Sequence, residues 1–191
     1  MRTLKGLGAA LLFLLSACAA APAAEPVATA GAPAARQGDP KAQWWAQQSW
    51  RYGDAAAAEA AYQRLLASQS PWPEWHQPRV VELPIGTRFQ MALAPGQTNR
   101  QPGGFATFDL IPSVAYVRTR LAVKEAWKPK IDRVVVYEVV KPLPADTGEV
   151  GPQIDVPVNR YLPGGASQLE MKVPGPDRIS YLKVVDERPI R

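Results

Sequence analysis

The order of short apolar segments and proline or glycine breakers constrains the fold of this chain most. From Arg79 onward, breakers such as LAPGQ, QPGG, KPLPADTG, YLPGG and VPGPD separate seven segments with strand-like patterning. The segments are RVVEL, TRFQMAL, GFATFDL, SVAYVRTRLAV, DRVVVYEVV, SQLEMKV and ISYLKVV. Long helices do not fit this pattern, because proline removes a backbone donor and clashes with the preceding turn. The pattern predicts a mainly antiparallel β domain over residues 71–191.

The fourth of these segments contains a pair of arginines. As a strand, AYVRTRLAV would place Tyr116, Arg118 and Arg120 on one face, because side chains alternate with a period of two. The two arginines could line a polar cleft or could be solvated, and the spacing fits both. The following LAVKEAWK could form a short helix that Pro129 ends.

Helix-forming sequence precedes the β segments, in residues 41–70. Asp54 is a good N-cap, and Ala58, Tyr62, Leu65 and Leu66 recur on one helical face, so we predict a helix from Ala55 to about Ser68. A second helix over Ala42 to Trp50 would put Trp45 against the first. This tryptophan-rich stretch fits an apolar helical pair, or a carbohydrate or peptide platform. The predicted fold class is therefore α+β, with a short N-terminal helical element packed on the β domain.

Four prolines in PWPEWHQPRVVELP predict a non-helical linker between the helical element and the β domain. This linker contains His76, which is the one histidine of the sequence. A catalytic histidine needs an orienting partner, and none is evident in the sequence. We therefore expect His76 to be an exposed loop residue.

The single cysteine ends a segment with the features of an export signal. Residues 1–18 read MRTLKGLGAALLFLLSAC, with two early positive charges and an apolar stretch that is too short to cross a bilayer. With one cysteine and one histidine, the chain can form neither an internal disulfide nor a Cys/His zinc cluster, so no metal is expected.

The sequence Leu15-Ser16-Ala17-Cys18 resembles the lipobox of bacterial lipoproteins. The resemblance implies a signal peptide over residues 1–17 and lipidation of Cys18 by a diacylglycerol and a further acyl chain such as palmitate, which together suffice for stable anchoring. Because Ala19 rather than Asp follows, it implies the outer membrane, on its periplasmic or surface face. Residues 18–40 carry few large side chains, so we expect a flexible tether.

The charge and the missing motifs exclude several function classes. Without Arg2 and Lys5, the chain has 20 basic and 17 acidic residues, a net charge of +3 with no basic block, so no nucleic-acid partner is expected. The sequence has no P-loop, no GxGxxG after a strand and no HExxH. What remains is chemistry without a metal, such as binding a phosphorylated ligand through arginines and orienting it with amide side chains.

Two motifs in the β domain carry a family resemblance. The run from Val136 to Pro144 (VYEVVKPLP), followed by Gly148 and then by LPGGASQ ending at Gln168, resembles the C-terminal half of the necrotizing-toxin (TNT) type NAD glycohydrolases. The fold of that family is related to the ADP-ribosyltransferases. The chain departs from the family pattern at Thr87, Gln90, Ala166 and Leu169.

The resemblance implies cleavage of the nicotinamide–ribose bond of NAD+, with NAD+ as substrate and no cofactor. It implies catalytic roles for Gln168 and Arg88, and substrate-binding roles for Phe89, Arg118, Arg120, Gly164 and Gly165. These residue types suit the chemistry: arginines bind phosphates through charge-assisted bonds, glycines allow close backbone approach, and an amide can orient a ribose. The enzyme hypothesis requires Arg88, Arg118 or Arg120, and Gln168 to meet in one cleft. If these residues point to different faces, a protein that binds a partner without catalysis is favoured instead.

A second hypothesis is a non-enzymatic envelope lipoprotein that binds a partner protein, with a toxin-like fold that has lost activity. The tryptophan-rich stretch and the predicted helix would then be the interface. The sequence identifies no such partner.

Overall fold

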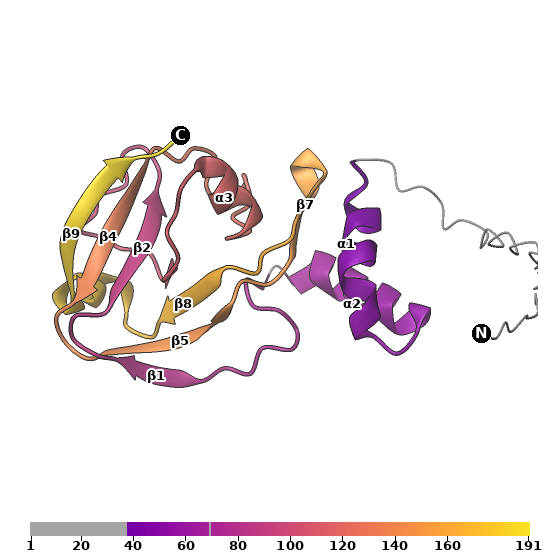
Figure 1. The fold of residues 1–191 in the computed structure, drawn as a ribbon, viewed down its shortest axis with the longest axis horizontal. Helices are drawn as coiled ribbons and strands as arrows, with labels where there is room; N and C mark the ends of the chain where they lie inside the picture. Colours follow the sequence, from indigo (N-terminus) through magenta and orange to yellow (C-terminus); the bar gives the residue numbers. More distant parts are fainter. Residues whose placement is uncertain (1–37, 69) are drawn as a thin grey trace, which may run out of the picture. The chain divides into compact units, whose positions relative to one another are not determined.

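The computed structural model describes residues 38–68 and 70–191, which form an α+β fold, as predicted (Figure 1). The lipobox with Cys18 and nearly all of the expected tether lie outside the described residues. Among the described residues, no helix has both the length and the apolar character needed to cross a membrane.

Two helices form the N-terminal element. In α1 (Pro40–Gln48), the Asp39 side chain caps the first turn by accepting from Lys41 N at 2.9 Å. A single 3-10 turn, η1 (Ser49–Arg51), leads to α2 (Ala55–Ser68), where Asp54 Oδ1 accepts from Ala57 N at 2.8 Å. The helix α2 has the predicted bounds, whereas α1 begins and ends two residues earlier than predicted.

Trp44 is the buried tryptophan of this element, and Trp45, which was predicted to lie against the second helix, is half-buried beside it. The Trp44 ring lies 5.2 Å from the ring of Tyr62 on α2, and the same cluster contains Ile154 and Tyr161 of the β domain. Trp45 packs at the edge of the cluster. The element therefore packs on the β domain through this aromatic cluster.

The described strands form two main antiparallel sheets and a small hairpin. The first sheet has the order β1 (Val80–Leu83), β5 (Leu143–Glu149), β8 (Ser167–Met171) and β3 (Phe105–Ala106). The second has the order β2 (Arg88–Leu93), β4 (Arg133–Val139) and β9 (Leu182–Pro189), and the hairpin pairs β6 (Gln153–Asp155) with β7 (Arg160–Leu162). A bridge between Gln90 and Thr107 joins the sheets, with Gln90 N donating to Thr107 O at 2.7 Å.

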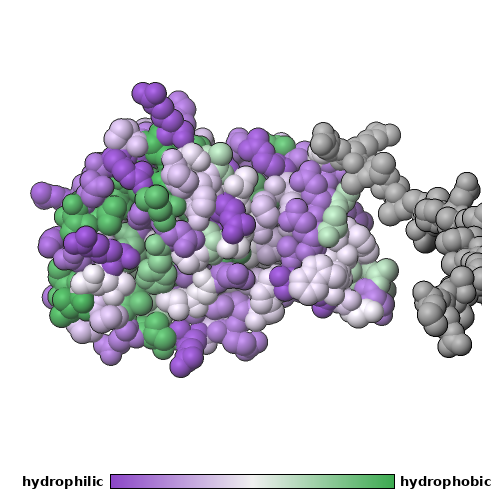
Figure 2. Space-filling model, viewed as in Figure 1, coloured by the Kyte–Doolittle hydropathy of each residue, from purple (hydrophilic) through white to green (hydrophobic). Residues whose placement is uncertain are grey.

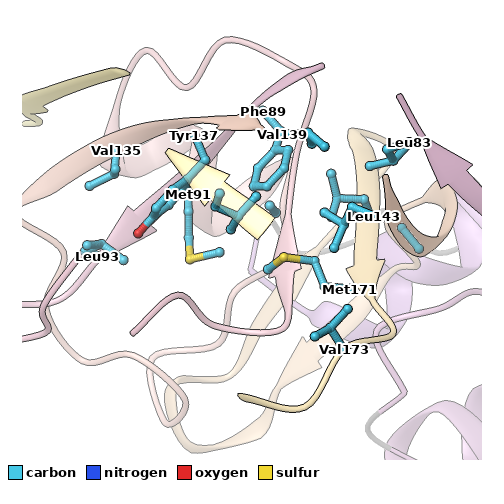
Figure 3. Close-up of a cluster of buried hydrophobic side chains, with 14 residues drawn as sticks. Leu83, Phe89, Met91, Leu93, Val135, Tyr137, Val139, Leu143, Met171 and Val173 are labelled. Carbon is cyan, nitrogen blue, oxygen red and sulfur yellow. The ribbon is translucent and has the colours of Figure 1, made fainter. Parts of the chain in front are cut away.

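The main core lies between the two sheets (Figure 3). Leu83, Leu143, Leu169 and Met171 come from the first sheet. They meet Phe89, Met91, Leu93, Val135, Tyr137 and Val139 from the second. Full burial of each such side chain contributes about 1.5–3 kcal/mol. On the face drawn in Figure 2, apolar residues also gather over the β2-β4-β9 sheet, while the helical end is mostly pale or hydrophilic.

The fourth predicted strand is a helix, and this prediction was wrong. The segment forms α3 (Val114–Thr119), because Ser113 Oγ accepts from Tyr116 N at 3.2 Å and caps it. The residues that follow contain turns around Glu125 to Trp127 instead of the short helix that was considered.

The bounds of other segments also differ from the predictions. The segment β5 was interpreted as a breaker because it contains Pro144 and Gly148. Pro144 is tolerated near the start of the strand, since pairing with β8 begins at Ala145. The 3-10 segment η3 (Gly175–Tyr181) replaces the first part of the last predicted strand.

Candidate active site

A cavity of about 520 Å³ lies between β2, β3 and the segment that follows α3, with Gln168 of β8 in its wall. Its apolar wall contains Met91, Ala92, Phe105, Ala106, Val117, Leu121, Val123 and Trp127. Its polar side chains are Gln90, Gln97, Thr107, Lys128 and Gln168. A mainly apolar cavity of this size with a few polar groups is typical of small-molecule sites.

The side chain of Gln168 is buried, at 6 % exposed, and its amide lacks a full set of partners. Its Nε2 atom has no hydrogen-bond partner among the described residues. An unpaired buried amide N–H costs about 1–3 kcal/mol, so Gln168 carries an unsatisfied donor in the folded protein. The sequence identified Gln168 through its motif, and the structure places it in the cavity wall.

Lys128 supplies the positive charge of this cavity. Its Nζ donates to Ala92 O at 2.6 Å and to Gln97 Oε1 at 3.2 Å. An ammonium group has three donors, so one remains for a ligand. Burial lowers the pKa of Lys128, and the guanidinium groups of Arg118 and Arg133 lower it further. Lys128 could not be recognised from the sequence, because it lies in an irregular segment without a motif.

Arg118 holds the segment that carries Lys128 and does not itself line the cavity. The guanidinium is buried and donates to four backbone oxygens, those of Val123, Lys124, Lys128 and Pro129, at 2.6–3.2 Å. Burial lowers the pKa of Arg118. Arg118 is therefore a positioning residue, because its guanidinium donates to backbone oxygens of the segment that carries Lys128.

Arg120 and the glycine pair form a turn beside the cavity. Arg120 donates to Gly165 O at 3.0 Å, and Gly164 N donates to Thr119 O at 2.9 Å. Both glycines have a positive φ, and a Cβ at Gly164 would lie 2.5 Å from Val150 O, so a larger residue does not fit there. The two glycines thus fix the turn that leads into β8.

Arg88 and Phe89 lie away from the cavity. Arg88 is exposed on β2 and forms an ion pair with Glu138 at 2.8 Å. Phe89 is 1 % exposed in the core, with its ring 5.9 Å from that of Tyr137. The sequence-based expectation that arginines and Gln168 meet in one cleft is not met, because Gln168 lines this cavity and Arg88, Arg118 and Arg120 do not.

Asp109 orders the residues next to Gln168. Its Oδ2 accepts from Ser167 N at 2.8 Å and from the Tyr116 hydroxyl at 3.0 Å. Although burial opposes the effect, hydrogen bonds from Ser167 and Tyr116 lower the pKa of Asp109. A carboxylate thus fixes the start of β8 and, with it, the backbone of Gln168. Asp109 could not be recognised from the sequence, since it lies inside the predicted strand GFATFDL.

The linker covers the face of the first sheet that carries Gln168. His76 stacks on Trp72 with ring centroids 4.0 Å apart, and its Nε2 lies 3.1 Å from both carboxylate oxygens of Asp146. The His76 side chain is only 10 % exposed, so the prediction of an exposed histidine was wrong. The partner, Asp146, lies on the unpredicted strand β5. Pro71 of the same linker lines the cavity.

The described residues contain no group of three His, Cys, Asp or Glu side chains that could hold a metal ion. The groups available for chemistry in the cavity are therefore amides, an ammonium, a hydroxyl and aromatic rings. These can bind, orient and stabilise charge in a substrate that supplies its own leaving group.

The sequence matches no protein-family model and no curated protein. Among solved structures, the chain is similar to the structure of Tne2 in complex with Tni2, with a TM-score of 0.51 and 26 % identity over 62 % of this chain and 97 % of the matched chain.

Two further solved structures are more weakly similar. For Tse6 in complex with Tsi6, the TM-score is 0.41 with 18 % identity over 79 % of this chain and 93 % of the other. For Rhs1-CT in complex with its cognate immunity protein RhsI1, the TM-score is 0.39 with 18 % identity over 60 % of this chain and 81 % of the matched chain. These two similarities do not establish a shared fold. The match to Tne2, with its TM-score of 0.51, shows that the fold of this chain is similar to that of Tne2.

Proposed function

We propose that this chain is a membrane-anchored NAD+ glycohydrolase with a toxin-like fold that uses the cavity at Gln168. The observation that carries the proposal is the unpartnered, buried Nε2 of Gln168 in the wall of a cavity of about 520 Å³. Gln168 is also the residue that matches the catalytic glutamine in the TNT resemblance. The structural similarity to Tne2 supports this assignment at the level of the fold.

The proposed reaction breaks the bond between C1′ of the ribose and the nicotinamide nitrogen. The bonding electron pair leaves with nicotinamide and neutralises its positive charge, water adds a hydroxyl to C1′, and a proton is released. The products are nicotinamide, ADP-ribose and a proton. The Gln168 amide would hydrogen-bond a ribose hydroxyl, which orients the sugar for the oxocarbenium-like transition state.

In this proposal Lys128 has the phosphate-binding role that was expected of the arginines. Its remaining donor can bind a pyrophosphate oxygen, and an ammonium acts there as a point charge. Trp127 also lines the cavity and is 44 % exposed, so its ring can stack on the nicotinamide or the adenine. The cavity thus offers one group for a ribose, one for the pyrophosphate and one for a base.

Cleavage of a fluorescent etheno derivative of NAD+ by the purified full chain tests the proposal. Q168A should reduce the rate by about 100-fold or more, as loss of a group that stabilises the transition state does. Gln77 is exposed and does not line the cavity, so Q77A is the matched control and should retain the wild-type rate. No cleavage by the wild type, or equal rates for wild type and Q168A, contradicts the proposal.

The anchoring part of the proposal rests on the lipobox and has its own test. Cys18→Ser should abolish fatty-acid labelling and release the protein from outer-membrane fractions, since two or more acyl chains are needed for stable anchoring. Labelling and membrane association that persist in this variant contradict the lipid anchor. Neither result changes the expectation for Gln168.

Binding of a partner protein without catalysis is the second candidate function. It is favoured by the position of Arg88 and Arg118, which are engaged with Glu138 and with backbone oxygens instead of a ligand. Trp50, at 69 % exposed, would be part of the interface. A wild-type chain that neither binds nor cleaves NAD+ supports this candidate.

A further inference from the structure

A second cavity, of about 420 Å³, lies between the helical element and the linker and shares no lining residue with the first. Four aromatic side chains line it: Trp44, Tyr52, Trp72 and Trp75. Arg64 and Glu74 supply charged hydrogen-bonding groups at the same site. We infer that this cavity binds a neutral saccharide, an activity separate from the proposed cleavage of NAD+.

The aromatic rings of this cavity are held in place by contacts outside it. Trp72 is stacked on His76 at 4.0 Å with an interplanar angle of 9°, and its Nε1 donates to Glu170 Oε2 at 3.3 Å. The Arg51 guanidinium lies 4.1 Å from the ring centroid of Trp75. Rings fixed in this way lose little conformational entropy when a ligand packs on them. Such fixed aromatic rings suit the apolar face that the C–H groups of a sugar ring form.

The polar groups of the cavity suit hydroxyls better than ions. Arg64 donates to both oxygens of Glu74, at 2.6 and 3.2 Å, so the two charges offset each other. Both side chains are partly exposed, at 58 % and 39 %. The guanidinium therefore keeps donors, and the carboxylate keeps lone pairs, for an uncharged ligand with alternating donors and acceptors. Sugar hydroxyls have this character.

Two other ligand classes fit these residues less well. An extended peptide needs a strand edge to pair with, but Pro73 and Pro152 in the wall have no N–H, and Trp44, Gln48, Ala61, Arg64, Leu65, Ala67 and Ser68 lie on the helices α1 and α2. An organic cation would meet two positive charges, Arg51 at 4.1 Å from the Trp75 ring centroid and Arg64 in the cavity wall. A neutral saccharide avoids both difficulties.

Titration of the purified full chain with the N-acetylglucosamine trimer, maltotriose and cellotriose tests the inference, in a detergent without a sugar head group. Tryptophan fluorescence and calorimetry should both report saturable binding of at least one trisaccharide. W75A should weaken that binding by about tenfold or more, which corresponds to about 1.4 kcal/mol. E74Q should also weaken it.

Trp127 gives the matched control, because it has nearly the same exposure as Trp75, 44 % against 40 %, but lines the other cavity. W127A should leave trisaccharide binding unchanged, and W75F should retain part of it. Circular dichroism verifies that each variant is folded. Absence of binding for all three trisaccharides at millimolar concentration, or equal binding by wild type and W75A, overturns the inference. Binding of tetramethylammonium in place of any saccharide overturns it as well.

Discussion

The guanidinium of Arg118 donates to the backbone oxygen of Lys128 at 2.6 Å, so an arginine on α3 positions the ammonium that lines the candidate active site. Three further backbone oxygens accept from the same group. R118A should leave these buried oxygens unpaired and lower the free energy of unfolding by about 2–4 kcal/mol. Urea denaturation measures this change.

Arg120 is the matched control for Arg118. It is exposed and donates to one backbone oxygen, so R120A should change the free energy of unfolding by about 1 kcal/mol or less. R118K keeps a positive charge but cannot reach four oxygens, and it should resemble R118A. Equal stability of R118A and R120A would contradict the role of the four Arg118 hydrogen bonds in stabilising the fold.

Lys128 should make the stability of the protein depend on pH. Burial lowers its pKa from the ordinary 10.5, so between the lowered value and 10.5 the unfolded chain binds more protons than the folded chain. Stability therefore rises with pH through this window. K128M should remove that contribution and flatten the rise.

Thermal or urea unfolding of wild type and K128M at several pH values up to 10.5 measures this effect. The exposed Lys130 gives the control variant K130M, whose profile should follow that of the wild type. A K128M profile as steep as that of the wild type would show that Lys128 has no such role.

Most of the fold could be predicted because alternation and breakers are local signals. The helix α2 and the strands β1, β2 and β4 lie where the pattern places them. The α3 segment could not be assigned from its alternation, because the cap at Ser113 decides between strand and helix. The strand β5 could not be found, because its proline and glycine are accommodated by contacts with distant residues.

The candidate site was predictable only in part. A motif identified Gln168, but motifs carry no information on whether an arginine is free for a ligand. Arg88 pairs with Glu138 across two strands, and Arg118 pairs with a segment whose path follows from tertiary packing. Likewise, the burial of His76 depends on Asp146, 70 residues away in the chain.

Gly148 should be sensitive to the smallest substitution. A Cβ at this position would lie 2.7 Å from His76 Cε1 and 3.1 Å from the Trp72 ring. G148A should displace the linker and lower the free energy of unfolding by about 1–3 kcal/mol, the usual cost of overpacking. Urea denaturation gives the energy, and near-ultraviolet circular dichroism reports on the environment of Trp72.

Gly53 supplies the comparison for Gly148, since a Cβ there meets nothing within 4 Å. G53A should leave both signals close to those of the wild type. A G148A variant as stable as G53A would contradict the close packing of His76 and Trp72 against Gly148.

Ionisation of the Tyr137 hydroxyl should destabilise the protein at alkaline pH. Burial raises its pKa to about 12, with a further contribution from Glu187, and its hydroxyl donates to Asn99 O at 2.7 Å. Because the folded pKa exceeds the ordinary 10.0, the neutral tyrosine stabilises the fold below pH 10, and this contribution is lost as the pH rises towards 12.

A rise in the pKa of Tyr137 from 10.0 to about 12 corresponds to a loss of about 2–3 kcal/mol of folding stability across this pH range. Y137F cannot ionise, so the stability difference between wild type and Y137F should shift in favour of Y137F from pH 10 to 12. Urea denaturation of both proteins over this range measures it. A difference that stays constant with pH would contradict the raised pKa of Tyr137.

Chromatographic analysis of unlabelled NAD+ incubated with the purified full chain tests the proposed function most directly. The wild type should release nicotinamide and ADP-ribose in equal amounts, and Q168A should release them about 100-fold more slowly or not at all. NAD+ that remains intact at high protein concentration, or products formed equally fast by Q168A, would contradict the assignment of this cavity to NAD+ cleavage.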